Sequence, residues 1–528
     1  MLLFRSCRAR ALSAASRLMS YRYGNGITIL TTLKNSQTKK HASNYRCFDA
    51  NPCANMTTPG IALHELGGQA LISAYRRREL SPVEVVQSVL RHIDQWEPHL
   101  HASYLLRPEL ALQQARESED RWQCGEPCGP LDGVPVTIKE NIATQGDPMP
   151  LGTLASDLIP APSDAPPAAR LREAGAVLLC KTTMPDYGML SSGLSSFHPL
   201  SRNPWDLSKT PGGSSAGGGA AAAAGYGPLH VGTDIGGSLR LPASWCAIFS
   251  LKPSLGRIPI DPNYTGRAAG PMTRCVADSA LMMQTLALPD ARDSMSLPYQ
   301  AIPWEQFDRG AEILRGLRIG LLLDAGCGLE VESEVRAAIE RAARIFEQAG
   351  AIVEPMLPFM TPAMLDGMDH AWRMRSHMDL AALHPDRKAL VLPYIQQWAD
   401  SAASMSGPQV FTAFSQFHAT RVATVRACQP FDYVISPTAP MPAFAAELPS
   451  PTNDPLRPLE HIGFTVPFNM SEQPAASINC GYTASGLPIG LQIAGRRFDD
   501  LGVLQVSRAF ELLRDPQRPW PAMPSAVR

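Results

Sequence analysis

Residues 210–253 read TPGGSSAGGGAAAAAGYGPLHVGTDIGGSLRLPASWCAIFSLKP, and this stretch decides how the rest of the sequence is interpreted. It holds two glycine clusters that carry serine, at residues 212–215 and 236–238. Glycine reaches backbone conformations that other residues avoid, so the second cluster lets the chain turn sharply before its serine. Consecutive backbone N–H groups in such a turn point into one concavity, which stabilises a developing oxyanion. The N–H groups expected to do so belong to Ile235, Gly236, Gly237 and Ser238.

The first cluster precedes the small residues 216–224, which predict a tight turn that opens a closely packed, alanine-rich helix. Two known motifs come close to these clusters without fitting. A phosphate-binding loop requires GxxxxGK[ST], and neither cluster has a lysine followed by Ser or Thr. A GxSxG nucleophile elbow occurs literally at residues 213–217, but an elbow follows an apolar strand, and polar residues and Pro211 precede this one. Taken singly, either cluster would be a glycine turn with incidental serines.

Outward from this stretch, predicted helices and strands alternate, which is typical of α/β architecture. Residues 61–101 are expected to be largely helical and to pack as an arm on the core, because Ser81, Pro82 and Glu84 form a capping box with proline at the first helical position. The peripheral stretch 361–425 is also expected to be helical. Further helices are predicted at 108–123, 168–174 and 332–348, and strands at 134–138, 176–180, 317–323, 431–436 and 490–493.

Lys139 follows the predicted strand 134–138, so we expect it where a buried strand emerges. Together with the two glycine clusters, this lysine completes a recognisable pattern. The segments DGVPVTIKENI (132–142), GGSSAGGGA (212–220), GTDIGGSLRLPA (232–243) and GLPIGLQIAG (486–495) resemble the amidase signature family of serine hydrolases. The resemblance spans about residues 60–515 and implies one α/β/α domain around a large mixed, twisted sheet.

Carried over residue by residue, the resemblance implies that Ser238 is the acyl nucleophile, Ser214 the bridging serine and Lys139 the terminal base. It also implies a cis peptide bond between Gly213 and Ser214. Ala216 departs from the family pattern, since many members have glycine there, but this change leaves the three catalytic positions intact.

Supporting roles are expected for Ser215 and for Asp234 and Arg240, which flank the nucleophile turn and would orient its backbone. For either charged residue, a purely structural ion pair is an equally good interpretation.

The chemistry explains why a lysine suits this position. Lys139 accepts a proton only when it is neutral, and burial beside hydroxyls without a carboxylate partner would lower its pKa toward neutrality. Glu140 should therefore point away if it extends the strand, since alternate residues of a strand face opposite sides. The Ser214 hydroxyl donates and accepts at once, so it relays the proton of Ser238 and returns it to the leaving nitrogen.

The amino-acid composition limits the kinds of molecule that the protein is expected to bind. The chain has 528 residues with 47 Lys+Arg against 48 Asp+Glu, a formal net charge of −1, so it has no excess positive charge to attract nucleic acid or an anionic membrane. The longest small-residue run is Ala and Gly, so no transmembrane helix is expected. Eleven scattered cysteines argue against a disulfide scaffold, and the twelve histidines show no paired metal spacing.

The near-neutral total conceals an asymmetric chain. Residues 1–55 carry nine basic residues and one acidic residue, a balance of +8, which leaves −9 for residues 56–528. This leader is interpreted as a disordered tail, a transit peptide, or sequence upstream of a true start at Met56. Residues 56–528 are expected to form one continuous domain in the cytoplasm, with organelle targeting as the alternative.

The function expected from the sequence is hydrolysis of the C–N bond of a small carboxylic amide, through an acyl-enzyme on Ser238 and without metal or organic cofactor. Two alternatives keep the same three residues: a carbamate or ester hydrolase, and the glutaminase A subunit of a tRNA-dependent amidotransferase. The pocket for the acyl group is expected to be shaped by residues 186–196 and parts of 361–470, and a homo-oligomer is possible.

Overall fold

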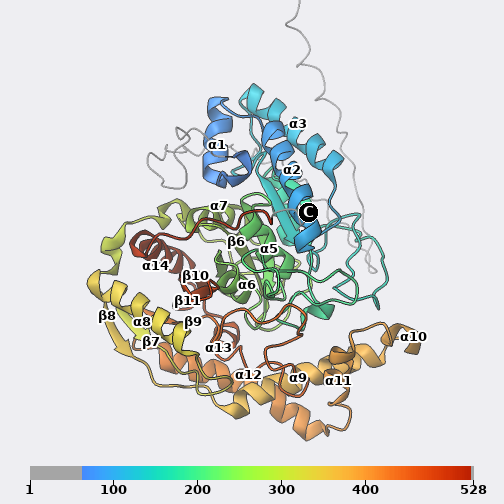
Figure 1. Cartoon of the computed structure of the whole chain (residues 1–528), viewed down its shortest axis with the longest axis vertical. Coiled ribbons are helices and arrows are strands. Elements are labelled where there is room, and N and C mark those ends of the chain that lie inside the picture. The colour runs from blue at the N-terminus through green and yellow to red at the C-terminus, as the bar shows by residue number, and fades with distance from the viewer. Residues whose placement is uncertain (1–61, 525–528) are drawn as a thin grey trace, which may run out of the picture. The chain divides into compact units, whose positions relative to one another are not determined.

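The computed structural model describes residues 62–524, and within this range eleven strands form one sheet. Their order across the sheet is β1-β3-β2-β4-β6-β5-β10-β11-β9-β7-β8. Figure 1 labels β6, β10, β11, β9, β7 and β8 of this sheet. The strands are β1 (Ser103–Tyr104), β2 (Pro135–Lys139), β3 (Val177–Thr182), β4 (Leu229–Asp234), β5 (Phe249–Lys252), β6 (Ala268–Thr273), β7 (Arg318–Leu321), β8 (Ile352–Pro355), β9 (Tyr433–Pro437), β10 (Ala475–Tyr482) and β11 (Pro488–Ala494).

Parallel and antiparallel neighbours alternate in blocks, as expected of a mixed sheet. Strand β2 runs parallel to both β3 and β4, and β7 runs parallel to β8 and β9. Between these two parallel blocks, the pairs β4–β6, β6–β5, β5–β10, β10–β11 and β11–β9 are antiparallel. The parallel pair β2 and β4 is the part that matters for function, because its carboxyl ends meet at one edge of the sheet.

The helices are α1 (Gly68–Arg77), α2 (Pro82–Leu100), α3 (Pro108–Cys124), α4 (Pro166–Glu173), α5 (Ala216–Ala224), α6 (Arg240–Trp245), α7 (Val276–Leu286), α8 (Ser333–Gln348), α9 (Pro362–Ala381), α10 (Pro385–Lys388), α11 (Pro393–Asp400), α12 (Gly407–Cys428), α13 (Val466–Met470) and α14 (Asp500–Leu513). Four short 3-10 turns complete the described range, η1 (Leu63–Glu65), η2 (Asp186–Gly188), η3 (Trp304–Phe307) and η4 (Ala311–Leu314).

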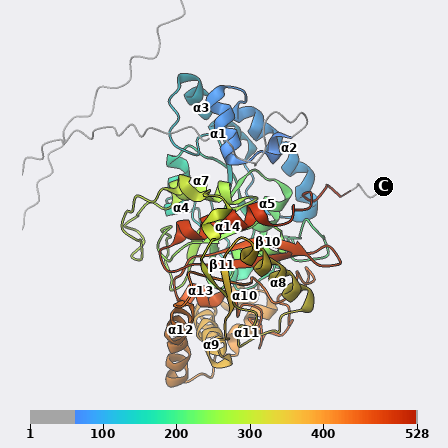
Figure 2. The same ribbon diagram turned by 90° about the vertical axis from the view of Figure 1, so that its left-hand side faces the viewer.

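Helices pack on both faces of the sheet. The evidence is that neighbouring residues of one strand belong to different hydrophobic clusters. On β9, Ile435 joins a cluster with Ile339 of α8 and Phe510 of α14, whereas its neighbour Val434 joins a cluster with Phe468 of α13. Figure 2 shows α14 close to α7, and the two helices are in contact. The expected α/β/α layering around one large mixed sheet is thus confirmed.

The predicted elements appear with shifted ends. The strand expected at 134–138 is β2, which includes Lys139, and the strand expected at 176–180 is β3, which extends to Thr182. The capping box at Ser81 and Glu84 forms as predicted at the start of α2. Residues 1–55, on which the leader prediction rests, lie outside the described residues.

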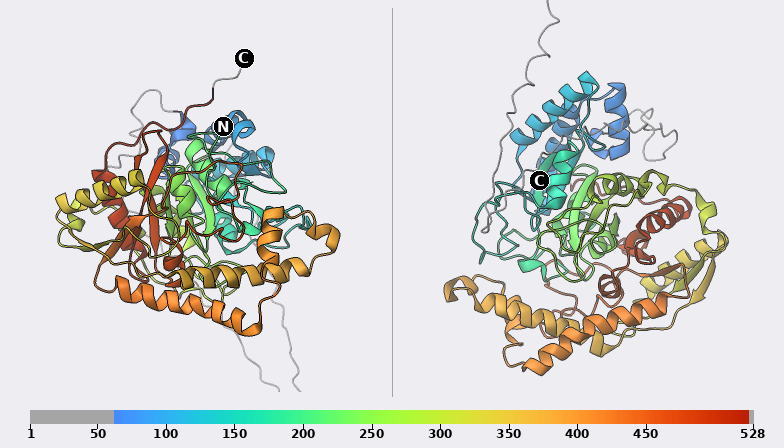
Figure 3. Two further views of the ribbon diagram at one scale, coloured as in Figure 1. Left: turned by 60° about the horizontal axis from the view of Figure 1, so that its bottom comes forward. Right: turned by 180° about the vertical axis from the view of Figure 1, so that it is seen from behind.

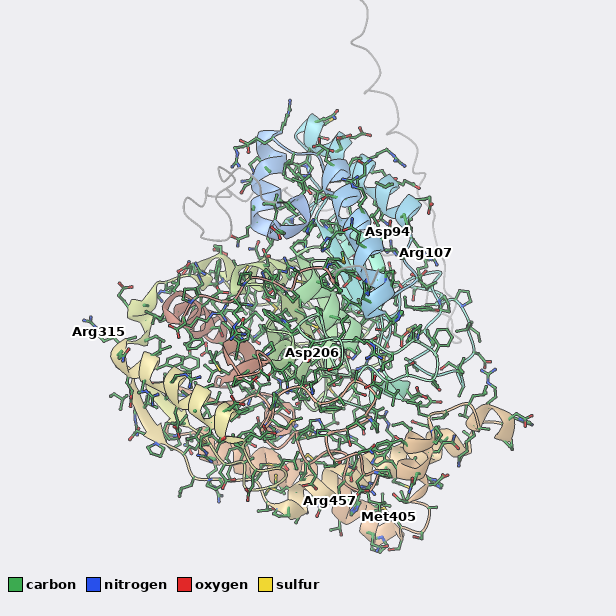
Figure 4. All side chains as sticks on the ribbon, viewed as in Figure 1. Asp94, Arg107, Asp206, Arg315, Met405 and Arg457 are labelled. Atoms are coloured by element: carbon green, nitrogen blue, oxygen red, sulfur yellow. The ribbon has the colours of Figure 1, made fainter. Side chains whose placement is uncertain are left out.

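The stretch expected to be helical at 361–425 divides into α9, α10, α11 and α12. Helices α9 and α12 lie side by side in both views of Figure 3 and are in contact. In Figure 4, the labelled side chains of Met405 and Arg457 lie in the same region as these helices. No helix of residues 62–524 is long and apolar enough to cross a membrane.

Candidate active site

Three segments beside the parallel strands β2 and β4 carry the predicted catalytic side chains. Lys139 is the last residue of β2, and Ser238 lies in the turn between β4 and α6. Ser214 precedes α5, in a turn whose Gly213–Ser214 peptide bond is cis, as the family resemblance implied. This turn is tightly packed, since a Cβ on Gly213 would lie 2.6 Å from the backbone N of Ser192. The site is therefore assembled where β2 and β4 end and α5 begins.

The three side chains form one hydrogen-bonded chain. Lys139 Nζ lies 2.8 Å from Ser214 Oγ, and Ser214 Oγ lies 3.1 Å from Ser238 Oγ. Lys139 and Ser214 are buried, and Ser238, the last of the three hydrogen-bonded side chains, is partly exposed. The structure thus brings together all three residues in the order that the sequence predicted, with the most accessible hydroxyl farthest from the lysine.

Lys139 is surrounded by hydroxyl groups. Besides Ser214, its Nζ lies 3.1 Å from Ser215 Oγ and 3.3 Å from Thr233 Oγ1. Within residues 62–524 no carboxylate lies within 4 Å of this nitrogen. Burial, and then the positive charge of Arg267, hold the pKa of Lys139 well below its ordinary value, against the weaker opposing effects of Asp234 and Glu140.

The three hydroxyl groups around Lys139 Nζ can serve a neutral amine. A neutral lysine has two N–H groups to donate and one lone pair that accepts. Ser215 Oγ donates to the Thr233 carbonyl at 3.2 Å, so it is free to accept from Lys139. If Ser215 and Thr233 take the two N–H groups, the lone pair of Lys139 faces the hydroxyl of Ser214. Thr233 was not singled out from sequence, because a threonine at the end of an apolar strand carries no chemical signature.

Glu140 points away from the lysine, as predicted. Its carboxylate bonds to His198 Nε2 at 2.7 Å, and both side chains are buried. Glu140 is the first residue after β2, and its bond to His198 keeps the nearest negative charge in the sequence out of contact with the base.

The nucleophile turn is held by Asp234. Its carboxylate accepts hydrogen bonds from the backbone N–H of Gly237 at 2.8 Å and of Leu239 at 3.1 Å. Gly237 has φ 129°, in the region that favours glycine, and a Cβ there would lie 2.7 Å from Thr465 Oγ1. This corrects one expectation: the N–H of Gly237 is used by Asp234 rather than pointing freely into the site, so Ile235, Gly236 and Ser238 remain as candidates for the oxyanion hole.

Asp234 and Arg240 form a fully buried two-bond ion pair, at 3.0 Å (Nε to Oδ2) and 2.9 Å (Nη2 to Oδ1). Burial alone would raise the pKa of the Asp234 carboxyl, but attraction to Arg240 and hydrogen bonds from Arg240 and Asn469 outweigh it and hold the pKa below its ordinary value. The remaining Arg240 donors bond to the Thr465 carbonyl, Gln492 Oε1 and Asn469 Oδ1. The pair therefore positions the turn through its backbone and does not reach the serine hydroxyls.

An apolar cluster lines the region of Ile235. It combines Tyr187 and Leu190 from the first predicted pocket segment with Trp372 and Ile462 from the second. A Cβ on Gly236 would lie 3.3 Å from Ile462 Cδ1 and 3.8 Å from Trp372 Cη2. Both segments expected to shape the acyl pocket thus meet beside the nucleophile turn.

Other polar and aromatic residues near the motif have structural contacts. Trp205 donates its Nε1–H to the Cys246 carbonyl at 2.8 Å and packs against Tyr482. Cys180 and Cys246 are buried, and burial raises the pKa of both thiols, which keeps them protonated. Asp206, labelled in Figure 4, caps its own turn by accepting from the Ser208 N–H at 2.9 Å.

Comparison with known proteins agrees with this geometry. The amidase family model matches residues 84–504. The A subunit of the glutamyl-tRNA(Gln) amidotransferase of Chloroflexus aggregans is 33% identical over 483 residues, which cover 86% of this chain and 97% of that protein. Its counterpart from Myxococcus xanthus is 35% identical over 474 residues, 83% of this chain and 95% of that one.

Solved structures show the same likeness. A bacterial aryl acylamidase of the amidase signature enzymes has a TM-score of 0.77 and 30% identity, covering 85% of this chain and 96% of that one. The 6-aminohexanoate cyclic dimer hydrolase, in complex with substrate, has a TM-score of 0.77 and 25% identity, covering 88% and 100%. From its sequence, its fold and the arrangement of its Lys, Ser and Ser side chains, the chain belongs to the amidase signature family, whose enzymes hydrolyse carbon–nitrogen bonds of amides.

Proposed function

We propose that this enzyme hydrolyses a small carboxylic amide through an acyl-enzyme formed on Ser238. The observation that carries the proposal is the continuous contact from Lys139 Nζ through Ser214 Oγ to Ser238 Oγ, at 2.8 and 3.1 Å. A serine hydroxyl is a weak nucleophile until a base removes its proton, and this chain leads to a lysine whose pKa is lowered. The residues thus supply a nucleophile, a relay and a base in one line.

Acylation begins with attack of Ser238 Oγ on the amide carbonyl. The Ser238 proton passes to Ser214 Oγ while the Ser214 proton passes to neutral Lys139. The backbone N–H groups of Ile235, Gly236 and Ser238 are proposed to stabilise the oxyanion that develops on the carbonyl oxygen. The proton then returns along the same route to the leaving nitrogen, so that ammonia or an amine departs as the C–N bond breaks.

Deacylation uses the same residues with water in place of the amine. Ser214 and Lys139 take a proton from the water that attacks the ester carbonyl, and Ser238 leaves with that proton restored. Atoms balance over the cycle: the amide and one water yield a carboxylic acid and an amine. Every catalytic group in this cycle is a side chain or backbone N–H group of this chain, and the amide and the water are the reactants.

The test is replacement of Ser238. Ser238→Ala is expected to lower kcat/KM for any amide substrate by about 10⁴-fold or more, because the nucleophile is lost. A fluorophosphonate probe should label the wild-type enzyme at Ser238 and leave the variant unlabelled. Ser485→Ala, at an exposed serine far along the chain, is the matched control and should retain both activity and labelling. Amidase activity near the wild-type level in Ser238→Ala would exclude the proposal.

A second candidate is favoured by the relatives. The amidotransferase A subunits of Chloroflexus aggregans and Myxococcus xanthus are similar to this chain over most of their length. The same three residues would then release ammonia from glutamine for a partner protein. Glutaminase activity measured on the isolated chain, compared with hydrolysis of an aryl or alkyl amide panel, distinguishes the two.

Carbamates and esters belong in the same substrate panel, since they are cleaved by the same acyl transfer. If an ester or urethane has a higher kcat/KM than every amide, the result supports the acyl-enzyme on Ser238 but excludes an amide as the preferred substrate.

A further inference from the structure

A positively charged side chain, that of Arg267, lies beside the nucleophile turn. Strand β6 begins at Ala268, which pairs with Asp234 at the end of β4, so the next residues outward are Arg267 and Ile235. Asn469 holds this corner together, because its Nδ2 donates to the Gly266 carbonyl at 3.0 Å and to Asp234 Oδ1 at 2.9 Å. Arg267 is therefore placed at the side of the turn that carries candidate oxyanion N–H groups.

Arg267 is poorly satisfied where it lies. Its Nη1 donates to the Pro262 carbonyl at 3.2 Å, and within residues 62–524 no carboxylate lies within 4 Å of its guanidinium. Burial, and then the charge of Arg375, lower its pKa to about 10. The side chain is only partly buried, and a guanidinium has five N–H donors, so Arg267 has donors available for an anionic ligand.

The second arginine approaches from another element. Arg375 lies on α9, three residues after Trp372 and so on the same side of the helix. Trp372 reaches the nucleophile turn at Gly236, and Arg375 Cζ lies 4.8 Å from the ring centre of Tyr264, in the turn that leads to Arg267. Helix α9 thus brings a second arginine toward the same corner, with its Nε 3.7 Å from Asp379 Oδ2 on the same helix.

Two uncharged polar atoms near the turn also lack partners. Trp372 Nε1 and Asn141 Oδ1 are buried without a hydrogen bond to any described residue. Asn141 is close to the base, since its Nδ2 donates to Thr233 Oγ1 at 3.1 Å. Buried polar groups are normally paired, so both atoms could take a further polar partner.

We propose that Arg267, assisted by Arg375, binds a carboxylate of the substrate, so that the preferred substrates are amides that also carry a free carboxylate, such as monoamides of dicarboxylic acids. The inference rests on the proposed function, because it names the substrate class of the Ser238 site. A guanidinium and a carboxylate match in a planar, two-bond geometry, and the ligand charge would neutralise a cation that the protein leaves without an anion. The apolar cluster around Trp372 and Ile462 would hold the carbon chain or ring between the two polar ends.

The experiment uses pairs of amides that differ only in the carboxylate: succinamate with butyramide, glutaramate with valeramide, and 4-carboxybenzamide with benzamide. For each pair, the ratio of kcat/KM for the charged to the neutral amide is measured in the full-length enzyme. The wild-type ratio should exceed about 10 for at least one pair, and Arg267→Gln should lower it by about 10- to 100-fold, the loss expected for a charged hydrogen bond. Arg267→Lys should restore part of it, and Arg375→Gln should lower it less.

Arg309→Gln, at an exposed arginine between η3 and η4, is the matched charge control and should leave the ratio unchanged. Protection of Ser238 from a fluorophosphonate by each amide gives a second readout that needs no turnover and applies to a variant with low activity. A wild-type ratio near 1 for every pair, or a ratio that Arg267→Gln does not change, overturns the carboxylate proposal while amide hydrolysis stands. Failure of the wild-type enzyme to be labelled at Ser238 overturns the proposed function itself.

Discussion

At the scale of single residues, Thr233 and Ser215 decide which way the lysine faces. Both lie within hydrogen-bond distance of Lys139 Nζ, at 3.3 and 3.1 Å, and when both accept its N–H groups the lone pair faces Ser214. Thr233→Val keeps the shape of the side chain but removes one acceptor. We expect kcat to fall about 5- to 100-fold with little change in KM, since a lost hydrogen bond of this kind corresponds to about 1–3 kcal/mol.

Steady-state kinetics on one amide substrate, together with thermal unfolding, checks this expectation. The melting temperature should stay close to that of the wild type because the methyl groups fill the same space. An unchanged kcat in a folded Thr233→Val variant would show that the amine is oriented without this hydroxyl.

The pH dependence follows from the same lysine. Only neutral Lys139 accepts a proton, so kcat/KM should rise with pH through the pKa of this group, which lies well below its ordinary value. The positive charge of Arg267 disfavours protonated Lys139. Removing that charge in Arg267→Gln should therefore raise the pKa of Lys139 and move the acidic limb of the profile to higher pH. Profiles of kcat/KM on a neutral amide measure the shift, and a limb that moves to lower pH would contradict the assignment.

At the scale of elements, α7 caps α1 through a buried carboxylate. Asp278 of α7 accepts from the Gln69 backbone N–H at 3.4 Å, at the first turn of α1. Burial, together with the weaker effect of Glu511, raises the pKa of Asp278 to about 7, so the folded protein keeps a proton that the unfolded chain has released. This group therefore contributes stability below about pH 4 that is lost progressively as pH rises to about 7.

Asp278→Asn should remove this dependence. Between pH 4.5 and 7.5 the melting temperature of the wild type should fall by about 5 °C more than that of the variant, because the variant has no proton to lose. Thermal unfolding at both pH values provides the measurement. Parallel pH dependence in the two proteins would mean that Asp278 is already ionised in the folded state.

Helix α5 illustrates why the motif region tolerates so few side chains. A Cβ on Gly217 would lie 2.1 Å from the Ala102 carbonyl oxygen, so the helix touches backbone from a segment more than a hundred residues earlier. The alanine-rich composition predicted close packing, and the structure shows which neighbour requires it. Ala216, the departure from the family pattern, is itself fully buried.

At the scale of the whole molecule, Arg240 joins distant parts of the chain. It contacts Asp234 at the end of β4, Thr465 and Asn469 around α13, and Gln492 on β11. Removing one partner of a buried ion pair costs about 3–5 kcal/mol because the other charge remains unpaired. Arg240→Met should therefore destabilise the protein by about that amount, and an Asp234→Asn, Arg240→Met double variant should recover part of the loss.

Arg318 serves as an exposed control for the buried pair of Arg240, since both Arg318 and its ion-pair partner Glu354 are exposed. Arg318→Met should change the free energy of unfolding by less than about 1 kcal/mol. Urea unfolding of the four proteins compares them directly. If Arg240→Met is no more destabilising than Arg318→Met, the buried pair does not stabilise this region.

The sequence predicted Lys139, Ser214 and Ser238 because their motifs are contiguous and carry unusual glycine patterns. It also located both ends of Lys139's strand to within one residue, since alternation and turns are local properties. It did not predict Thr233, Asn469 or Arg267. Their local sequence carries no motif, and their roles come from contacts between residues up to 235 positions apart in the chain. Gly237 was misjudged for the same reason: whether an N–H is free depends on where the Asp234 carboxylate folds back.

The ends of the sheet have a consequence for how the protein behaves at high concentration. One end is β1, only two residues long, and the other is β8, which includes the charged Glu354 and ends in Pro355, a residue without a backbone N–H. A strand edge with free hydrogen-bonding groups invites a neighbouring molecule to add its own strand, and short, charged or proline-bearing edges discourage this. Aggregation by edge-to-edge growth is thereby opposed at both margins, and assembly into oligomers would proceed through helical surfaces instead.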